Sequence, residues 1–229
     1  MRFLGNQLNN HGYTVRGARL AGHGTSVDDL ARSTRQDWYA SARQALRALR
    51  KQSPQVAIVG QSMGALLALR LAVEHPSEVS AVALLAPAMR LSKRWVEWAR
   101  PLLPWLAYSG YSFPKEAGDI ADAEARAERR AYRRMPLCAL HQLLELQQEV
   151  RPLLSAVRQP ALVIHSRQDH TCSLEGVHML ENALTGPVHT VILEKSYHVV
   201  SVDVERERVA ATVAAFVADT SPAQLPKCG

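Results

Sequence analysis

The chain has 229 residues, of which 47% are hydrophobic and 21% are charged. This composition excludes intrinsic disorder over the whole chain and supplies enough apolar side chains for one sizeable core. The longest apolar stretches fall well short of the ~20 residues that a bilayer span requires, so we expect no transmembrane helix.

The formal net charge is +6, but no basic stripe with interleaved aromatic residues accompanies it, so we expect no nucleic-acid partner. Cys138, Cys172 and Cys228 are too scattered for a disulfide framework or a zinc site. Together with the lack of a signal-peptide pattern after Met1, they favour a cytoplasmic location. The densest basic run favours a solvated helix face over a patch that docks on an anionic surface. That run consists of Arg126, Arg129, Arg130, Arg133 and Arg134.

Short runs rich in Val, Ile and Leu alternate with helical patterns along the chain, which is typical of a mostly parallel sheet covered by helices. The predicted strands are residues 13–16, 55–59, 79–86, 161–166 and 188–193. The predicted helices between and after them are residues 38–49, 63–74 and 204–218. The sequence therefore predicts the α/β fold class.

Residues 89–157 break this alternation, because they contain helical patterns at 121–134 and 137–150 but no strand candidate. We expect a core of residues 1–88 and 158–220, a helical cap inserted at 89–157 and a loose tail at 221–229. The apolar stripe at the start of the cap fits two roles, an apolar acyl site and the cap's own core. A stripe of this kind more often forms a core. The stripe consists of Trp95, Trp98, Leu102, Leu103, Trp105 and Leu106.

The sharpest signal is Gly60-Gln61-Ser62-Met63-Gly64, which follows the predicted strand 55–59 and opens the next helix. A serine at the centre of G-x-S-x-G lies on a strained turn, where its hydroxyl projects into a cleft at the positive end of the helix. Glycines two residues on either side remove the Cβ atoms that would collide with the neighbouring helix and strand. The turn therefore predicts a nucleophilic Ser62.

A serine nucleophile needs a histidine base and a carboxylate that orients it, and in such a sheet they follow in the order serine, acid, histidine. Asp169 lies just past strand 161–166, at the sheet edge where open α/β sheets bind ligands. His198 follows the last strand across a short loop and reaches the same edge. The competing residues are Asp203 and Glu194 for the acid and His170 for the base. No metal-ligand spacing and no nucleotide-binding loop is present, so we expect no metal and no cofactor.

These residues resemble the α/β-hydrolase superfamily, and more narrowly its bacterial carboxylesterases and monoacylglycerol lipase-like enzymes. The segments that carry the resemblance are residues 11–15, 21–26, 60–64, 167–169 and 196–203. The resemblance implies a serine hydrolase with nucleophile Ser62, acid Asp169 and base His198. It also implies that the cap shapes the acyl pocket, and that the turn at residues 22–24 is structural rather than a substrate contact.

The chain departs from the family pattern at two places. Tyr197 stands where the family usually has glycine before the base. The family also has an H-G-type loop before its first helix, whose N–H group joins that of the residue after the serine in the oxyanion hole. No such segment precedes residues 2–8 here. We therefore expect an N-terminally truncated α/β-hydrolase fold, with the Met63 N–H as its one oxyanion donor. Either the gene product starts further upstream than Met1, or the truncated chain has compromised folding.

The sequence thus predicts hydrolysis of small-molecule carboxylic esters, with an apolar acyl chain, through an acyl-enzyme on Ser62. A thioesterase, an acyltransferase or a peptidase shares the same triad, and sequence motifs do not separate these enzymes. The remaining alternative is a hydrolase-like scaffold that binds without turnover. The loss of one oxyanion donor, which costs about 10²- to 10³-fold in turnover, makes that alternative worth testing.

Overall fold

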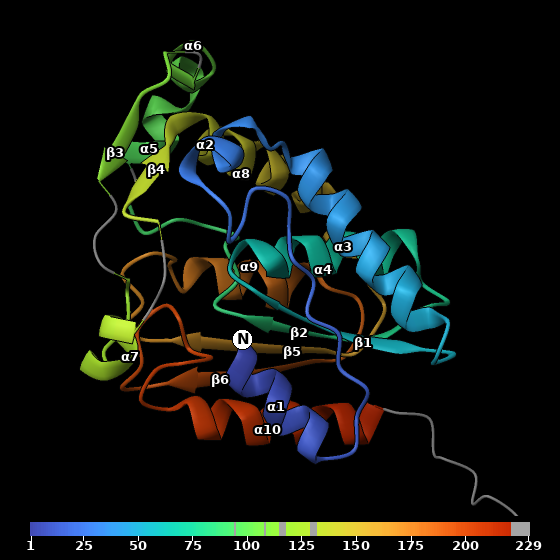
Figure 1. Ribbon diagram of the computed structural model, residues 1–229. Helices are drawn as coiled ribbons and strands as arrows, with labels where there is room; N and C mark the ends of the chain where they lie inside the picture. The colour runs from blue at the N-terminus through green and yellow to red at the C-terminus, as the bar shows by residue number, and fades with distance from the viewer. Residues whose placement is uncertain (94, 108, 115–117, 129–131, 221–229) are drawn as a thin grey trace, which may run out of the picture.

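The computed structural model describes residues 1–93, 95–107, 109–114, 118–128 and 132–220, in which a parallel sheet lies between two layers of helices (Figure 1). The sheet has four strands in the order β1-β2-β5-β6, and each is parallel to its neighbours. The strands are β1 (Val56–Gln61), β2 (Val79–Leu85), β5 (Ala161–Ser166) and β6 (Val188–Leu193). The predicted α/β class, with its parallel sheet, is confirmed.

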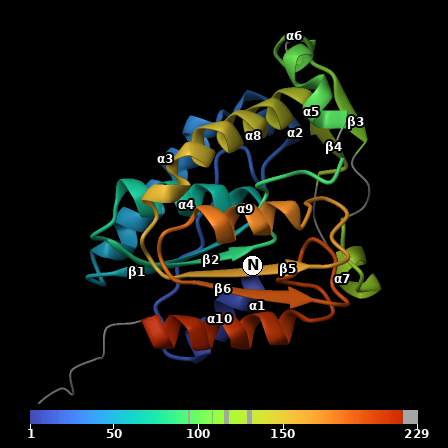
Figure 2. The same ribbon diagram turned by 180° about the vertical axis from the view of Figure 1, so that it is seen from behind.

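Helices cover both faces of the sheet, as Figures 1 and 2 show from opposite sides. One face carries α1 (Arg2–Asn10) and α10 (Arg206–Thr220), and the other carries α3 (Arg35–Arg50), α4 (Met63–Glu74) and α9 (Glu175–Ala183). Because both faces are covered, β5 is buried along its whole length, as the apolar run of its sequence predicts. Within the described ranges, no helix is both long enough and apolar enough to cross a membrane.

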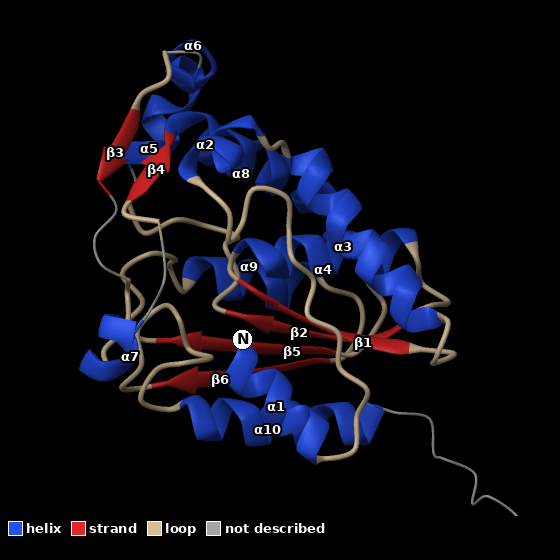
Figure 3. Ribbon diagram, viewed as in Figure 1, coloured by secondary structure: helices blue, strands red, loops and turns tan. Residues whose placement is uncertain are grey.

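The predicted strand at residues 13–16 is wrong, because the chain forms an irregular loop there (Figure 3). A strand needs a neighbour that completes its hydrogen bonds. Among the described strands, β1 lies at one edge of the sheet and pairs with β2 alone. The N–H group of Tyr13 instead donates to the Leu8 carbonyl of α1, and Val15 is 42% exposed.

The inserted segment 89–157 contains a short antiparallel pair that the sequence analysis did not predict. Its strands β3 (Ser112–Pro114) and β4 (Arg134–Pro136) have three residues each, too few for an alternating pattern to be visible. The helices around this pair are α5 (Trp95–Ala99), η1 (Arg100–Leu102), α6 (Leu103–Ala107), α7 (Ala123–Glu128), α8 (Leu137–Val150) and η2 (Arg151–Ala156).

One helical prediction needs correction, and one helix was not predicted. The pattern at 121–134 yields only α7 as described helix, because the chain has turned into β4 by Arg134. Residues 129–131, with Arg129 and Arg130 of the basic run, and the predicted tail at 221–229 lie outside the described residues. The helix α2 (Val27–Arg32) was not predicted, although Ser26 caps it by accepting a hydrogen bond from the Asp29 N–H group.

The apolar stripe forms neither a packed cap core nor a continuous pocket wall. Trp98 and Trp105 are 83% and 82% exposed, whereas Leu103 is buried with Val96 and Leu140 in a small cluster. The helices α5 and α6 have five residues each, so each offers one turn for packing, and the remaining side chains face outward. Trp95 alone among the tryptophans of the stripe lines the cavity described below.

Candidate active site

Ser62 lies on a strained turn between β1 and α4. Its backbone angles are φ 55° and ψ −118°, and a non-glycine residue rarely adopts a positive φ. Two backbone hydrogen bonds hold the turn, since the Ser62 N–H donates to the Leu85 carbonyl (2.8 Å) and the Ser62 carbonyl accepts from the Ala88 N–H (3.2 Å). Ser62 directly precedes α4, and the Met63 N–H, the first of that helix, has no partner inside the helix.

Only one of the two motif glycines is required by space, which corrects the symmetric role expected from the motif. A Cβ added at Gly60 would lie 2.7 Å from the Ala65 nitrogen and still closer to the Gly64 carbonyl, whereas a Cβ at Gly64 would meet no atom within 4 Å. We expect Gly60→Ala to lower the free energy of unfolding by about 2–3 kcal/mol, because the helix must move away from the strand. Gly64→Ala, the matched control, should change it by less than about 1 kcal/mol. Urea titrations that give equal losses for both variants would contradict this.

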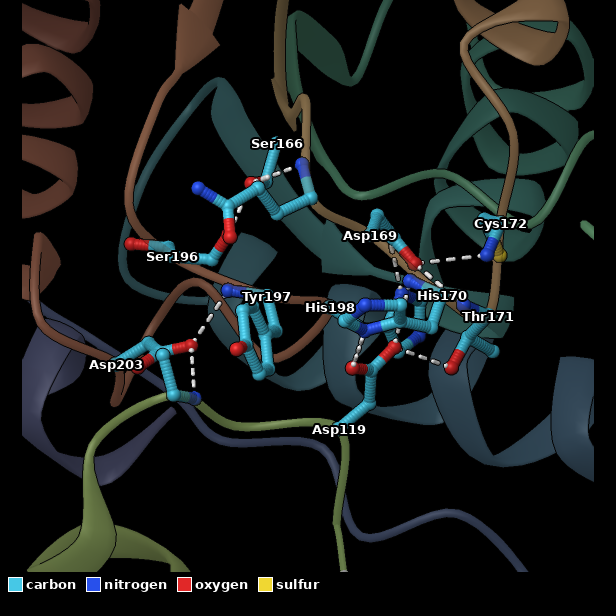
Figure 4. A network of polar contacts seen from close by, with 12 residues as sticks. Asp119, Ser166, Asp169, His170, Thr171, Cys172, Ser196, Tyr197, His198 and Asp203 are labelled. Carbon is cyan, nitrogen blue, oxygen red and sulfur yellow. Dashed lines mark hydrogen bonds and ion pairs between the residues drawn. The ribbon is translucent and has the colours of Figure 1, made fainter.

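Asp169 extends from the loop after β5, and its side chain is fully buried. Its Oδ1 accepts hydrogen bonds from the N–H groups of Thr171 and Cys172, each at 2.8 Å. Its Oδ2 faces Nδ1 of His198 at 2.8 Å. The loop thus folds around its own carboxylate and aims the second oxygen at the histidine (Figure 4).

His198 lies in the loop after β6 and joins the acid to the serine. Its Nε2 is 2.9 Å from Oγ of Ser62, while Nδ1 faces Asp169. Because an ionised carboxylate only accepts hydrogen bonds, Nδ1 carries the proton in the neutral ring. That tautomer leaves the Nε2 lone pair free to accept the Ser62 hydroxyl proton. The structure therefore brings together Ser62, Asp169 and His198, the three residues that the sequence analysis selected.

The environment of Asp169 keeps it ionised. Burial alone would raise its pKa, but the hydrogen bond and the charge of His198, with the Cys172 N–H, outweigh it and hold the pKa below the ordinary 3.8. Asp169 therefore stays charged between about pH 7 and pH 5, and we expect kcat/KM for an ester to show no proton uptake by Asp169 over this range. A fall in kcat/KM with a slope of two over this range, in a pH series with a neutral substrate, would mean that Asp169 titrates there.

The competing residues have other partners. Asp203 is fully buried, and its carboxylate accepts from the N–H groups of Tyr197 (2.7 Å) and Ala121 (3.0 Å). Glu194 pairs with Arg167 at the surface. The ring of His170 binds Asp119 through Nδ1 at 2.8 Å. These contacts favour structural roles for all three competitors.

Two residues that contact the acid loop were not singled out from the sequence as functional. His165 is buried on β5, with Nε2 3.1 Å from the Cys172 carbonyl and 3.6 Å from Oδ2 of Asp169. Burial lowers its pKa, so the ring is neutral beside the acid. Asp119 lies in the inserted segment, 50 positions before Asp169 in the numbering. Nothing in its local sequence indicates a contact with that loop.

The site also contains a set of atoms with metal-binding chemistry. Ligand atoms of Asp169, Cys172 and His198 lie within 4.8 Å of one another. However, burial raises the pKa of the Cys172 thiol well above its ordinary value, so the sulfur keeps the proton that a metal ligand must lose. Asp169 and His198 are already hydrogen-bonded to each other. The donor set therefore suits a paired acid and histidine better than a metal ion.

A cavity of about 1680 Å³ opens beside the Ser62 hydroxyl. It extends from the serine under the inserted segment and, on the other side, along the outer edge of β1 to α1. Apolar side chains of the inserted segment line it, namely Val96, Phe113, Met135, Leu140 and Leu143. His23, from the turn at residues 22–24, also lines the cavity, but its Nδ1 bonds the Ala21 carbonyl and its ring packs edge-on against Trp38.

The chain is similar to known proteins. The profile of the serine aminopeptidase S33 family, Hydrolase_4, matches residues 2–205. A thermostable monoacylglycerol lipase from Bacillus sp. (strain H-257) is 26% identical over 212 residues, which cover 91% of this chain and 81% of the lipase. A carboxylesterase from Bacillus subtilis (strain 168) is 24% identical over 219 residues, which cover 95% of this chain and 86% of the esterase.

Among solved structures, one described under LipS and LipT, two metagenome-derived lipolytic enzymes, superposes with a TM-score of 0.85 at 29% identity. The superposition covers 96% of this chain and 87% of that one. The monoacylglycerol lipase of Paleococcus ferrophilus superposes with a TM-score of 0.72 at 15% identity and shows likeness of fold.

Proposed function

The chain belongs to the serine aminopeptidase S33 family and has the α/β-hydrolase fold, and we propose that it hydrolyses carboxylic esters through an acyl-enzyme on Ser62. The observation that carries the proposal is the continuous hydrogen-bonded chain from Ser62 through His198 to Asp169. The relatives named as lipase and carboxylesterase place the chain among carboxylic ester hydrolases. The residue roles and the substrate below are our proposal.

In the acylation step, Oγ of Ser62 attacks the ester carbonyl carbon while Nε2 of His198 takes the hydroxyl proton. Asp169 holds the ring in the required tautomer and stabilises the imidazolium that forms. The imidazolium then gives its proton to the leaving alkoxide, so the alcohol departs neutral and the acyl group stays on Ser62. Acylation thus leaves the histidine neutral again.

In the deacylation step, His198 removes a proton from water, whose oxygen attacks the acyl carbonyl, and then returns the proton to Oγ of Ser62. The products are a carboxylic acid and free enzyme. In both steps negative charge develops on the carbonyl oxygen. The Met63 N–H lies at the positive end of α4, beside Ser62, and is the oxyanion donor that this proposal assigns.

The cavity lining favours an ester with an apolar acyl chain over a peptide. An aminopeptidase must hold the charged amino terminus of its substrate with an anion. Among the described residues that line the cavity, the one carboxylate is Asp119, which already accepts hydrogen bonds from His170 and Thr171. The apolar wall from the inserted segment suits a hydrocarbon chain instead.

A fluorophosphonate probe tests the nucleophile directly, because it phosphonylates only an activated serine. We expect the wild-type chain to be labelled at Ser62 and Ser62→Ala to be unlabelled. Absence of labelling in wild-type protein with a cooperative unfolding transition would favour the non-catalytic scaffold. Labelling that persists in Ser62→Ala would assign the nucleophile to another residue.

A panel of nitrophenyl substrates then tests the substrate class. We expect kcat/KM to rise by about tenfold from acetate to a medium-length acyl ester, since each buried methylene adds up to ~0.8 kcal/mol of binding. Nitroanilides of amino acids should turn over more slowly than the esters. A panel in which the anilides or acyl thioesters are the better substrates would move the assignment to a peptidase or a thioesterase.

A further inference from the structure

Three segments meet beside Asp169 and His198. The acid loop (residues 167–173) carries Asp169, and the base loop (residues 194–203) carries His198. The stem segment (residues 118–122) lies within the inserted segment, directly before α7. Figure 4 shows side chains of all three segments joined by polar contacts. Catalysis needs Asp169 and His198 to keep one geometry, although they stand on two different loops.

Asp119 of the stem segment binds the acid loop through its whole carboxylate. Its Oδ2 accepts from the His170 N–H (3.0 Å) and from Oγ1 of Thr171 (2.8 Å), and its Oδ1 accepts from Nδ1 of His170 (2.8 Å). The Asp119 side chain is 14% exposed, whereas that of its partner His170 is 66% exposed. The residues that it holds are the two that directly follow Asp169.

The same residue also binds the base loop. The backbone carbonyl of Asp119 accepts from the N–H group of Val199, the residue after His198 (3.1 Å). The ring of His170, oriented by Asp119, packs edge-on against the ring of Tyr197, the residue before His198, at 4.7 Å between centroids. Asp119 therefore contacts one loop directly through its side chain and the other through its backbone.

The stem segment is itself anchored. The buried carboxylate of Asp203 accepts from the N–H groups of Ala121 (3.0 Å), Asp122 (2.9 Å) and Tyr197 (2.7 Å). Where the two loops leave the sheet, Ser166 Oγ donates to the Ser196 carbonyl, which fixes them at their base. Asp119 acts at the opposite end, beyond Asp169 and His198.

We infer that Asp119 is a positioning residue, which locks the acid loop to the base loop and so maintains the hydrogen bond between Asp169 and His198. The inference rests on the proposed function for its effect on turnover, but the geometry that it concerns is present in the free protein. The inserted segment thereby has a second role besides lining the cavity, namely to hold together the two loops that carry Asp169 and His198.

The test compares Asp119→Ala with Asp122→Ala, a matched control three residues away on the same segment. The Asp122 carboxylate accepts from the N–H groups of Glu124 and Ala125, at the start of α7, and touches neither loop through its side chain. We expect Asp119→Ala to lower kcat for a nitrophenyl ester by about 10- to 100-fold, with KM changed by less than about threefold, because a misplaced base slows chemistry more than binding. Asp122→Ala should keep kcat within about twofold.

A readout that does not depend on turnover is the low-field proton resonance of Nδ1–H in His198, assigned by its loss in Asp169→Asn. We expect Asp119→Ala to broaden this resonance through faster exchange with water, and Asp122→Ala to leave it as in wild type. Asp119→Asn, whose amide oxygen in the place of Oδ2 still accepts two of the three hydrogen bonds, should be intermediate in both kcat and line width. If Asp119→Ala fails to fold, Thr171→Val removes one of the three bonds and should show the same effects at smaller size.

The inference would be overturned if Asp119→Ala and Asp122→Ala had the same kcat and the same His198 resonance. A fall in kcat with an unchanged resonance would overturn it as well, because the loss would then not pass through the acid and base. Wild-type protein that shows the resonance but hydrolyses no ester would contradict the proposed function while leaving the positioning role testable by the resonance alone.

Discussion

Ser62→Ala is expected to lower kcat for ester hydrolysis by about 10⁶-fold, which is the largest effect of any single substitution proposed here. Without Oγ no acyl-enzyme forms, and in triad enzymes the loss of the nucleophile alone removes nearly the whole contribution of the triad. Some turnover above the uncatalysed rate should survive, because the oxyanion donor and the cavity remain. Steady-state kinetics with a nitrophenyl ester measure the loss.

The fold should not suffer from this change, since the Ser62 backbone rather than its hydroxyl holds the turn. We expect KM to stay within about tenfold of wild type and the unfolding midpoint to be unchanged or higher, because active-site polar groups often cost stability. Residual activity within a factor of ten of wild type, after removal of contaminating esterases, would show that another residue carries the reaction.

Asp169→Asn is expected to lower kcat by about 10⁴-fold while the protein remains folded. The amide keeps the shape of the side chain but turns an acceptor into a donor, so the histidine is driven into the wrong tautomer and its charged form loses its counter-ion. Oδ1 still accepts from the Thr171 and Cys172 N–H groups if the amide oxygen takes that place, so the loop geometry persists. Circular dichroism and kinetics on one preparation separate the two effects.

Asp203→Asn is the comparison that decides between the two candidate acids. Asp203 is fully buried, and its carboxylate accepts hydrogen bonds from four backbone N–H groups, those of Ala121, Asp122, Tyr197 and Val204. The NH₂ group of an asparagine there would face backbone N–H donors and leave them without an acceptor. We therefore expect the free energy of unfolding to fall by about 3 kcal/mol. The fall in kcat should be smaller than for Asp169→Asn. If Asp203→Asn is the more damaging to kcat in folded protein, the assignment of the acid to Asp169 is wrong.

The sequence alone determined the features that depend on short-range pattern. Val- and Leu-rich runs gave the strands of the parallel sheet, because a strand covered on both faces must be apolar throughout. The position of Ser62 followed from a turn that needs a strand before it, a helix after it and glycine at position 60. Asp169 and His198 followed from their places after strands, since the carboxyl ends of parallel strands lie at one edge.

The tertiary structure decided what depends on neighbours far away in the chain. The segment 13–16 has the composition of a strand, yet strand formation needs a partner, and sequence shows residues rather than partners. Trp98 and Trp105 face outward because two five-residue helices have too little surface to bury them. Asp119 looks like an ordinary loop carboxylate in the sequence, and Asp203 looks like a second candidate for the acid. The contacts of Asp119 with the acid loop, and those of Asp203 with Ala121 and Asp122, exist only because the inserted segment folds back onto the sheet edge, which local pattern does not encode.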